Sequence, residues 1–459
     1  MKKRTYRNRI MRTALCVAMA LAPTTLTAQT LTLDSCLALA RRNNADIRTT
    51  QLDVLKAQEV KKQVFTKFFP QVQLGALGYH AAEPLIRFGI NDIQSDDMRE
   101  LLQAIYEGAV TGGSDIKSEM TLMKRGASIS ATAAQPIFAG GRIVNGNRLA
   151  QLGVEAAELQ AAAKERDVLE NIESSYYLVT GLQQKVATLT AALDLIDSLD
   201  RTVQSALANG LVTKSDALQV QLKRNEMLAN QQQLTSGIRL AKRLLCRQIG
   251  IDYTDSTVFA DPSPATLPPI EYLYTMQADS LRPEMQLLRI NVEAEKLKRK
   301  MTIGETLPQL SIVGIGFYGN IIKKNAVGNA IAVLSLNVPL TAWWETSHKI
   351  RQHNIAIEEA GIMQDNLGKM MSLEEEKAYS DMLDAYMLMK SDSSALEVAK
   401  ENYRLSNLNY AAGNTTLSEV LQAHALLLQA QNAITDRRTT YTVARRRLLD
   451  LKGNNEHKR

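Results

Sequence analysis

The sequence is poor in aromatic residues and cysteine, and it lacks a long apolar run beyond its N-terminal segment. Aromatic side chains make up 5% of the 459 residues, and the stretches of helical periodicity contain almost no proline. A transmembrane helix needs about 18 or more consecutive apolar residues, so proteins of that class are excluded. The strands of a membrane-spanning barrel carry a much weaker signal, so that class stays open.

The motifs of enzymes and metal sites are also missing. The five histidines show no metal-ligand spacing, and neither a nucleophile elbow nor a Walker loop occurs. Residues 314–319 match the dinucleotide pattern G-x-G-x-x-G, but no helix opens directly after them. We interpret them as glycines of a bent strand. The sequence therefore predicts no catalytic residue, no metal and no cofactor.

The N-terminus has the pattern of a secretory signal peptide over residues 1–28. A basic start precedes an apolar run at 14–22, and small residues lead to a cleavage site after Ala28. This leader holds six of the 54 basic residues and none of the 48 acidic ones, so 48 of each sign remain. Nucleic-acid binding loses its support, because no positive excess is left to neutralise phosphates.

Two cysteines remain after the leader, Cys36 and Cys246. In an oxidising compartment they could form a disulfide. Two cysteines this far apart and without a motif also fit a pair of buried small residues. Both alternatives stay open.

The chain contains an internal repeat, in which residues 136–250 recur as residues 339–453. The displacement of 203 residues holds from a proline to a glycine more than a hundred residues later, so the copies carry almost no net insertion. Each copy has the pattern of a very long helix, a glycine turn and a returning helix. The first long helix is predicted from about Arg142 to Asn209, and it carries a coiled-coil seam.

Each half contains a pair of prolines, Pro70 and Pro136 in the first and Pro308 and Pro339 in the second. Between the two prolines of each pair the hydrophobic periodicity changes from 3.6 to 2, which indicates strands. The predicted division is a signal peptide at 1–28, a first repeat at 29–250, a Pro-rich connector at 251–281, a second repeat at 282–453 and a charged tail at 454–459. Each repeat is predicted to contain a leading helix, a β-hairpin and a long helical hairpin. The β-hairpins cover 71–138, with an outer loop at 83–124, and 309–340; the helical hairpins cover 142–249 and 345–450.

The returning helix, about Lys214 to Ile249, would be only about 55 Å long, against roughly 100 Å for the long helix. It cannot accompany the long helix over its whole length. The helices that lead into the strands, at 34–68 and 282–305, have about the missing length. We therefore expect a returning helix and a leading helix to stack end to end.

Aromatic residues gather where the predicted strands meet helices. They are Phe68, Phe69, Phe138, Trp343 and Trp344. Strands of about ten residues can cross a bilayer when tilted, and this placement is typical of an aromatic belt at a membrane interface. The alternative is that these rings belong to an ordinary core.

Several short stretches occur in the same order in a known family. They are residues 68–71, residues 135–142, Arg282-Pro283-Glu284, Leu307-Pro308-Gln309, and two glycine turns followed by an acidic residue and Leu-Gln. On these residues the chain resembles the TolC-type outer-membrane efflux channels, the outer membrane factors, over essentially its whole mature length.

The resemblance implies a mainly α fold with a transmembrane β part. Each protomer of a homotrimer would give four strands to a 12-stranded barrel and its long helical hairpins to a periplasmic tunnel. The residues independently require an oligomer, because four strands cannot close a barrel with room for a channel.

The resemblance also assigns roles to the two turns. Docking to a periplasmic adaptor would fall on Gly210, Leu211, Gly413, Asn414 and Thr415. The periplasmic constriction, or gate, would fall on Glu419, Gln422 and Tyr410, with Asp216 at the equivalent position of the first turn. The sequence departs from the family in having Gln422 for a second acid and Thr415 for an arginine. The alternative for Glu419 is an ordinary acidic residue near a helix N-terminus.

The implied function is that of a passive exit duct for drugs and small toxic molecules in the outer membrane of a diderm bacterium. Its partners would be a periplasmic adaptor (membrane fusion protein), an inner-membrane pump of RND or ABC type, and outer-membrane lipid. One alternative is an exit duct for type I protein secretion. Another, of a different class, is a soluble periplasmic coiled-coil scaffold, in which the strands form a small sandwich.

Overall fold

A computed structural model of the chain describes residues 30–83, 86–89, 93–111, 119–122, 125–260, 282–320 and 326–451. The predicted signal peptide, residues 261–281 of the connector and the charged tail lie outside the described residues. The chain forms two compact units, and each contains segments of both halves of the sequence. The first unit holds the described parts of 1–52, 159–285 and 366–459, and the second holds those of 53–158 and 286–365. The two long helices contribute to both.

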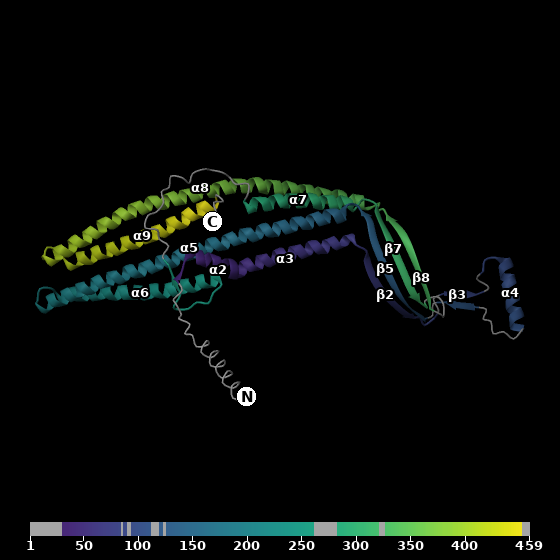
Figure 1. Ribbon diagram of the computed structural model, residues 1–459, viewed down its shortest axis with the longest axis horizontal. Helices are drawn as coiled ribbons and strands as arrows, with labels where there is room; N and C mark the ends of the chain where they lie inside the picture. The colour runs from purple at the N-terminus through teal and green to yellow at the C-terminus, as the bar shows by residue number, and fades with distance from the viewer. Residues whose placement is uncertain are drawn as a thin grey trace, which may run out of the picture. The chain divides into compact units, whose positions relative to one another are not determined.

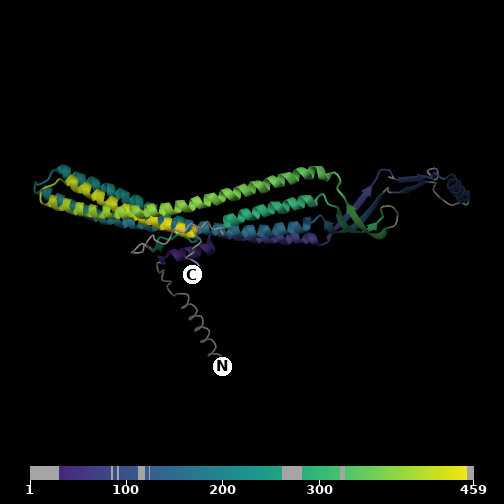
Figure 2. The ribbon, with the colours of Figure 1, turned by 90° about the horizontal axis from the view of Figure 1, so that it is seen from above.

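The first unit is built on the C-terminal parts of the long helices α5 (Arg142–Ala208) and α8 (Ala342–Ala411). The returning helices α6 (Lys214–Ile249) and α9 (Leu417–Leu451) run beside them, as two perpendicular views agree (Figures 1 and 2). These bounds lie within a few residues of the predicted ones. Buried residues of the predicted seam, Leu189, Leu193 and Ile196, pack in one cluster with residues of the other three helices.

The leading helix of the first half is interrupted, which the sequence did not predict. It consists of α2 (Leu33–Asn43), α3 (Ala45–Phe65) and the 3-10 turn Thr66–Phe68. The break lies at Asn44, whose side-chain oxygen accepts the backbone N–H groups of Asp46 and Ile47 at 2.9 and 3.1 Å. A side chain that caps a new helix competes with continuation of the old one, and this accounts for the break.

The same asparagine joins α6 to the leading helix. Its Nδ2 donates to the backbone oxygen of Gln248 at 2.7 Å. Gly250 ends α6 with a φ of 74°, and a Cβ there would lie 2.5 Å from the Cβ of Asn43. The returning helix therefore abuts the leading helix, as the end-to-end stacking predicted. A two-residue parallel pairing of β1 (Thr30–Leu31) with β6 (Val258–Phe259), missed by the sequence, lies beside this joint in the same buried cluster.

Ion pairs occupy the corresponding joint of the second half. Glu374 of α8 accepts from Arg282, just before α7 (Pro283–Gly304), at 3.1 Å and from Arg447 near the end of α9 at 3.4 Å. One carboxylate thus holds the start of one helix and the end of another. Arg166 of α5 also pairs with Glu284 in the first turn of α7.

The two cysteines are free thiols buried in one core cluster. Burial, with a smaller contribution from Cys246, raises the pKa of the Cys36 thiol to about 12. The structure therefore fits the second of the two alternatives, a pair of buried small residues.

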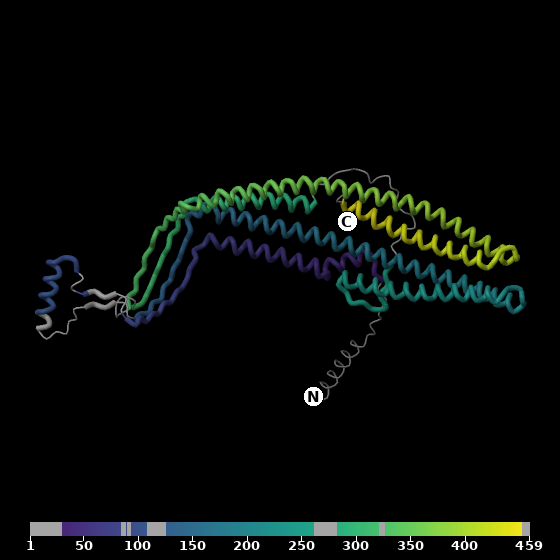
Figure 3. Tube along the Cα trace, turned by 180° about the vertical axis from the view of Figure 1, so that it is seen from behind, coloured from purple at the N-terminus to yellow at the C-terminus, as the bar shows by residue number. Residues whose placement is uncertain are grey.

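The second unit contains an antiparallel sheet in the order β2-β5-β7-β8 (Figure 3). Its strands are β2 (Gln71–His80), β5 (Arg125–Ala139), β7 (Gln309–Gly319) and β8 (Val327–Asn337). Each half supplies one hairpin, as predicted, and the pairing of β5 with β7 joins the halves. The stretch at 314–319 lies inside β7. A Cβ at Gly319 would lie 2.4 Å from the oxygen of Ala127 in β5, so close backbone approach explains that glycine.

The loop at 83–124 has structure of its own. It contains the paired strands β3 (Ile86–Gly89) and β4 (Glu119–Leu122) and the helix α4 (Asp96–Thr111). On α4 the side chains of Met98, Leu101 and Ile105 are exposed. None of the helices, as far as the structure describes them, is both long and apolar enough to cross a membrane.

The register gives the four-stranded sheet two different faces, because paired residues of neighbouring strands lie on the same side. We call one the polar face; its polar residues are Gln71, Gln73, Ser128, Ser130, Thr132, Gln309, Ser311, Asn329, Ser335 and Asn337. Apolar residues are interspersed there, among them Leu77, Val313, Ile315, Phe317, Val327, Ile331 and Val333. We call the other the apolar face; its large apolar residues are Val72, Leu74, Ile129, Phe138, Leu310, Ile312, Tyr318, Leu334 and Leu336. It also carries three polar side chains, His80, Arg125 and Gln135. A register shift between Pro136 and Phe138 places Phe138 on the apolar face.

Two glycines of the second unit let the turn after β5 approach the end of α7. A Cβ at Gly140 would lie 2.0 Å from the oxygen of Gly304, and one at Gly304 would lie 2.2 Å from the oxygen of Gly140. Gly140 also has a φ of 64°. Neither position accepts a side chain without movement of the backbone opposite.

We expect Gly304→Ala to destabilise the protein by more than about 1 kcal/mol, because the added Cβ must displace backbone atoms. Gly153→Ala is the matched control, since that helical residue has no atom within 4 Å of its ideal Cβ position. The control should leave stability unchanged or raise it. The measurement is the thermal unfolding midpoint in detergent, and equal midpoints for the two variants would contradict the close contact.

Candidate functional site

The candidate site consists of the turns of the two helical hairpins, both in the first unit. Both turns end the long helix in the same way. Gly210 and Gly413 have φ values of 71° and 76°, in the left-handed region that favours glycine. The backbone N–H groups of Gly210 and Leu211 donate to Leu207 and Ala206, and those of Gly413 and Asn414 donate to Tyr410 and Asn409. This is the Schellman arrangement, which satisfies the last carbonyls of a helix.

The first turn starts its returning helix with a capping box. The Thr213 hydroxyl accepts the N–H of Asp216 at 3.3 Å, and Asp216 accepts the N–H of Thr213 at 2.9 Å. The Thr213 hydroxyl also lies 2.7 Å from the Asp216 carboxylate. These hydrogen bonds from Thr213 hold the pKa of Asp216 below its ordinary value. The Asp216 carboxylate thus has a local structural role.

In the second turn the acidic residue, Glu419, forms different hydrogen bonds. Glu419 is exposed in the first turn of α9, and its backbone N–H donates to the Thr416 hydroxyl at 3.4 Å. Its carboxylate accepts a hydrogen bond from the hydroxyl of Thr415. The Thr415 hydroxyl therefore contacts Glu419 within one chain. Gln422 lies one turn further along α9 and is exposed.

The structure brings the two turns together over one buried cluster. Tyr410 of α8, Val212 of the first turn and Leu417 of α9 all pack against it. Burial, and secondly the charge of Asp216, raises the pKa of the Tyr410 phenol. Tyr410 and Asp216 therefore lie close enough to interact. In contrast, Leu211 is 77% exposed, so the first turn presents an apolar side chain to solvent within one chain.

A residue that the sequence did not single out, His424, lies at the centre of the helices below the turns. It is 2% exposed, and its Nδ1 has no hydrogen-bond partner among the described residues. It faces the other three helices of the two hairpins: the backbone of Ala192 in α5, the charge of Lys223 in α6, and the Tyr403 ring in α8, at 5.4 Å between centroids. The available signal was its place in a buried stripe with Val420, Ala423 and Leu427.

The predicted aromatic belt lies in the second unit. Phe68, Phe69, Phe138, Trp343 and Trp344 are between 39% and 78% exposed, so they form no core within one chain. The Trp343 indole N–H donates to the oxygen of Thr306 at 3.2 Å. No group of His, Cys, Asp or Glu residues that could hold a metal ion occurs within the described ranges.

Solved structures with the same fold are bacterial outer-membrane proteins. The outer membrane channel CmeC of Campylobacter jejuni is 15% identical, with a TM-score of 0.74 over 92% of this chain and 85% of that chain. The outer membrane protein VceC of Vibrio cholerae is 14% identical, with a TM-score of 0.72 over 92% and 96%. The outer-membrane channel OprN is 15% identical, with a TM-score of 0.73 over 92% and 90%. No curated protein sequence matches significantly.

A family model matches the first half of the chain. The model of outer membrane efflux proteins matches residues 36–244, from the leading helix through the first strands and turn to the returning helix. This part of the chain is similar to the outer membrane efflux proteins. The resemblance inferred from the short stretches is thereby confirmed, and so is the fold class, with its long helical hairpins and four strands per chain.

The buried histidine makes the stability of this protein depend on pH. Burial, and secondly Lys223, lower the pKa of His424 below its ordinary value of 6.5. Below that pH the unfolded chain binds a proton that the folded protein does not, so stability falls as the pH falls. The loss due to this residue is at most about 1.4 kcal/mol per pH unit.

We expect His424→Phe to flatten the dependence of the unfolding midpoint on pH between about pH 6.5 and pH 5. His348→Phe, which replaces an exposed histidine of α8, is the control and should keep the wild-type slope. Thermal unfolding at several pH values measures both slopes. An unchanged slope in His424→Phe would mean that His424 does not titrate differently on unfolding.

Proposed function

We propose that three copies of this protein form a passive exit duct through the outer membrane. The observation that carries this proposal is the sheet with one polar and one apolar face. Its outer strands β2 and β8 each pair on one side only, within the part of the chain that the structure describes. Four strands cannot close around a channel, and an open strand edge is a template for pairing with another chain. Three copies would give a barrel of 12 strands.

In such a barrel the apolar face meets lipid and the polar face lines the lumen. The barrel would also account for the exposure of the aromatic residues in the single chain. Phe68, Phe69, Phe138, Trp343 and Trp344 would lie at the membrane–water interface, where amphipathic rings are enriched. The helical hairpins would extend into the periplasm as a tunnel, after export by the signal peptide.

The turns would serve as the periplasmic end of the duct. The exposed Leu211, with Gly210 in the first turn and Gly413, Asn414 and Thr415 in the second, would dock to a periplasmic adaptor. The adaptor would couple the duct to an inner-membrane pump of RND or ABC type, which supplies the energy. The duct carries drugs and other small toxic molecules outward and performs no chemistry on them.

Three Glu419 side chains around one axis would form the gate, with Gln422, Tyr410 and Asp216 beside them. Like charges placed close together repel each other and attract cations. Opening would be a shift of the hairpin ends, driven by the adaptor.

The proposal predicts how the native protein behaves on extraction. The full chain should leave the cell envelope only with detergent, migrate as an oligomer that heat converts to monomer, and open ion channels in planar bilayers. A chemical cross-link of native envelopes should stop at three protomers. Release without detergent, as a species that opens no channels, would instead support the soluble periplasmic scaffold.

Reversal of the gate charge gives a second prediction. In channels formed by Glu419→Lys, we expect the reversal potential in a KCl gradient to shift toward that of chloride, because three positive charges replace three negative ones. Glu401→Lys is the control; Glu401 is an exposed residue of α8 that pairs with Arg404 at 2.7 Å. It should cause a smaller shift. Wild-type selectivity in Glu419→Lys would remove this residue from the constriction.

A further inference from the structure

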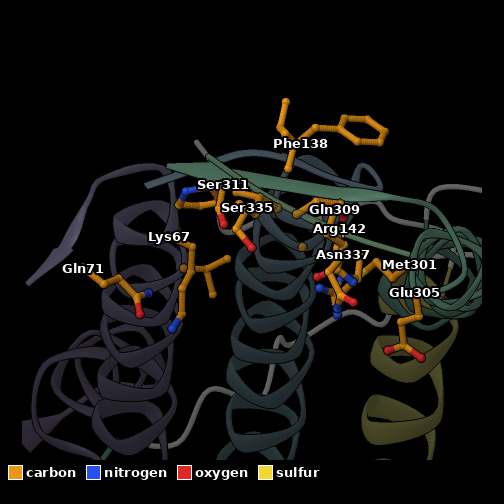
Figure 4. A pocket seen from close by; sticks show the side chains of 16 residues that line it. Lys67, Gln71, Phe138, Arg142, Met301, Glu305, Gln309, Ser311, Ser335 and Asn337 are labelled. Carbon is orange, nitrogen blue, oxygen red and sulfur yellow. Dashed lines mark hydrogen bonds between the residues drawn. The ribbon is translucent and has the colours of Figure 1, made fainter. Parts of the chain in front are cut away.

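A cavity of about 680 Å³ lies where the polar face of the sheet meets the helices of the second unit. It is lined by the end of α3, the start of α5, the end of α7 and the adjacent ends of the strands (Figure 4). This is the size of a site for a small organic molecule. The Phe138 ring projects to the opposite side of the sheet from the charged residues of the cavity (Figure 4).

The charges in the cavity are unequal in sign. Lys67 and Arg142 contribute two cations, and Glu305 contributes one carboxylate. Within the described residues, neither cation forms an ion pair, and the Nε of Arg142 donates only to the oxygen of Ala139, at 3.4 Å. The charge of Glu305 acts on Lys349, whose own partner is Glu345 at 2.8 Å. The cavity therefore keeps a positive excess.

Apolar and neutral polar groups complete the lining. Val64, Ile143 and Met301 contribute aliphatic surface, while Gln309 and Asn337 contribute amides. An occupant that matches this lining carries one negative group and one compact apolar part. Guanidinium and ammonium groups bind carboxylates, sulfonates and phosphates through charge-assisted hydrogen bonds.

We propose that this cavity is a binding site for small amphiphilic anions that pass through the duct. The anionic group binds between Lys67 and Arg142, and the apolar part packs on Ile143 and Met301. The site opens on the polar face, whereas a lipid would approach the apolar face, so the occupant is a solute of the lumen. The inference rests on the proposed duct, and it adds a preference opposite in sign to that of the Glu419 gate.

The test uses the purified full-length oligomer in planar bilayers, with naphthalene-2-sulfonate as the anionic probe. We expect the probe to reduce the channel current in a concentration-dependent manner. In the double variant Lys67→Gln/Arg142→Gln the half-blocking concentration should rise by about tenfold or more, because two charge-assisted contacts are lost. A naphthyl ammonium of the same size should block the variant at least as strongly as wild type, because two like charges have been removed.

Two further variants make the test specific. Lys62→Gln removes a cation of α3 that pairs with Glu59 at 2.7 Å and lies outside the cavity, and it should leave the block unchanged. Glu305→Gln removes the single carboxylate, and it should lower the half-blocking concentration. If the double variant does not assemble, Glu305→Gln decides.

Each failure has a separate meaning. Wild-type protein that opens no channels contradicts the proposed duct. Channels that open normally but are blocked equally in wild type, the double variant and Glu305→Gln overturn the anion site and leave the duct standing. A block that depends only on membranes of anionic lipid would assign the cavity to a lipid head group and also overturn the proposal.

Discussion

The fold depends on a mismatch of lengths between the long and the returning helices. A returning helix of 36 residues can accompany only about half of a helix of 67, since each residue adds about 1.5 Å to both. A second helix must cover the rest, so two helix ends have to meet. Helix ends leave backbone groups unsatisfied, and they cannot meet in a buried place without partners. The joints at Asn44 and Glu374 provide those partners by different chemistry. At the first, an amide caps one helix and donates to the other; at the second, a carboxylate binds two arginines.

The same requirement explains which parts of the fold were predictable from the sequence. The long helical hairpins were predictable, because the helical pattern of apolar residues extends over dozens of residues and ends in glycine. The alternation of the strands predicted two hairpins but not that β5 lies between β2 and β7, because alternation carries no information on neighbours. The break at Asn44 was missed because one side chain's hydrogen bonds decide it against a helical pattern on both sides. The pairing of β1 with β6 was missed because two-residue strands have no period to detect.

The positions of the two turns were predictable from the sequence, whereas their function is a proposal. Glycines with positive φ mark both turns, and the sequence placed them correctly. The sequence could not show whether the carboxylates of Asp216 and Glu419 are free to contact a partner. That depends on their hydrogen bonds to Thr213 and Thr415, which lie three and four residues before them. Nor could the sequence show His424 as the residue that faces all four helices, because a histidine in an apolar stripe gives no sign of what lies across from it. Burial of one polar ring among four helices is a property of packing, and packing is visible only in three dimensions.

The two turns show how equivalent acids of a repeat can form different hydrogen bonds on a similar backbone. Asp216 and Glu419 occupy equivalent positions, three residues after the residue that caps the returning helix. The shorter Asp216 side chain reaches back to the N–H of Thr213 and closes a capping box. Glu419 is one methylene longer, and the residue equivalent to Val212 is Thr415, which offers a hydroxyl donor one step further out. Val212 instead packs into the buried cluster. The Asp216 carboxylate thus caps the N-terminus of its own helix. The Glu419 carboxylate instead binds Thr415 at the exposed turn, where its charge can act on neighbouring groups.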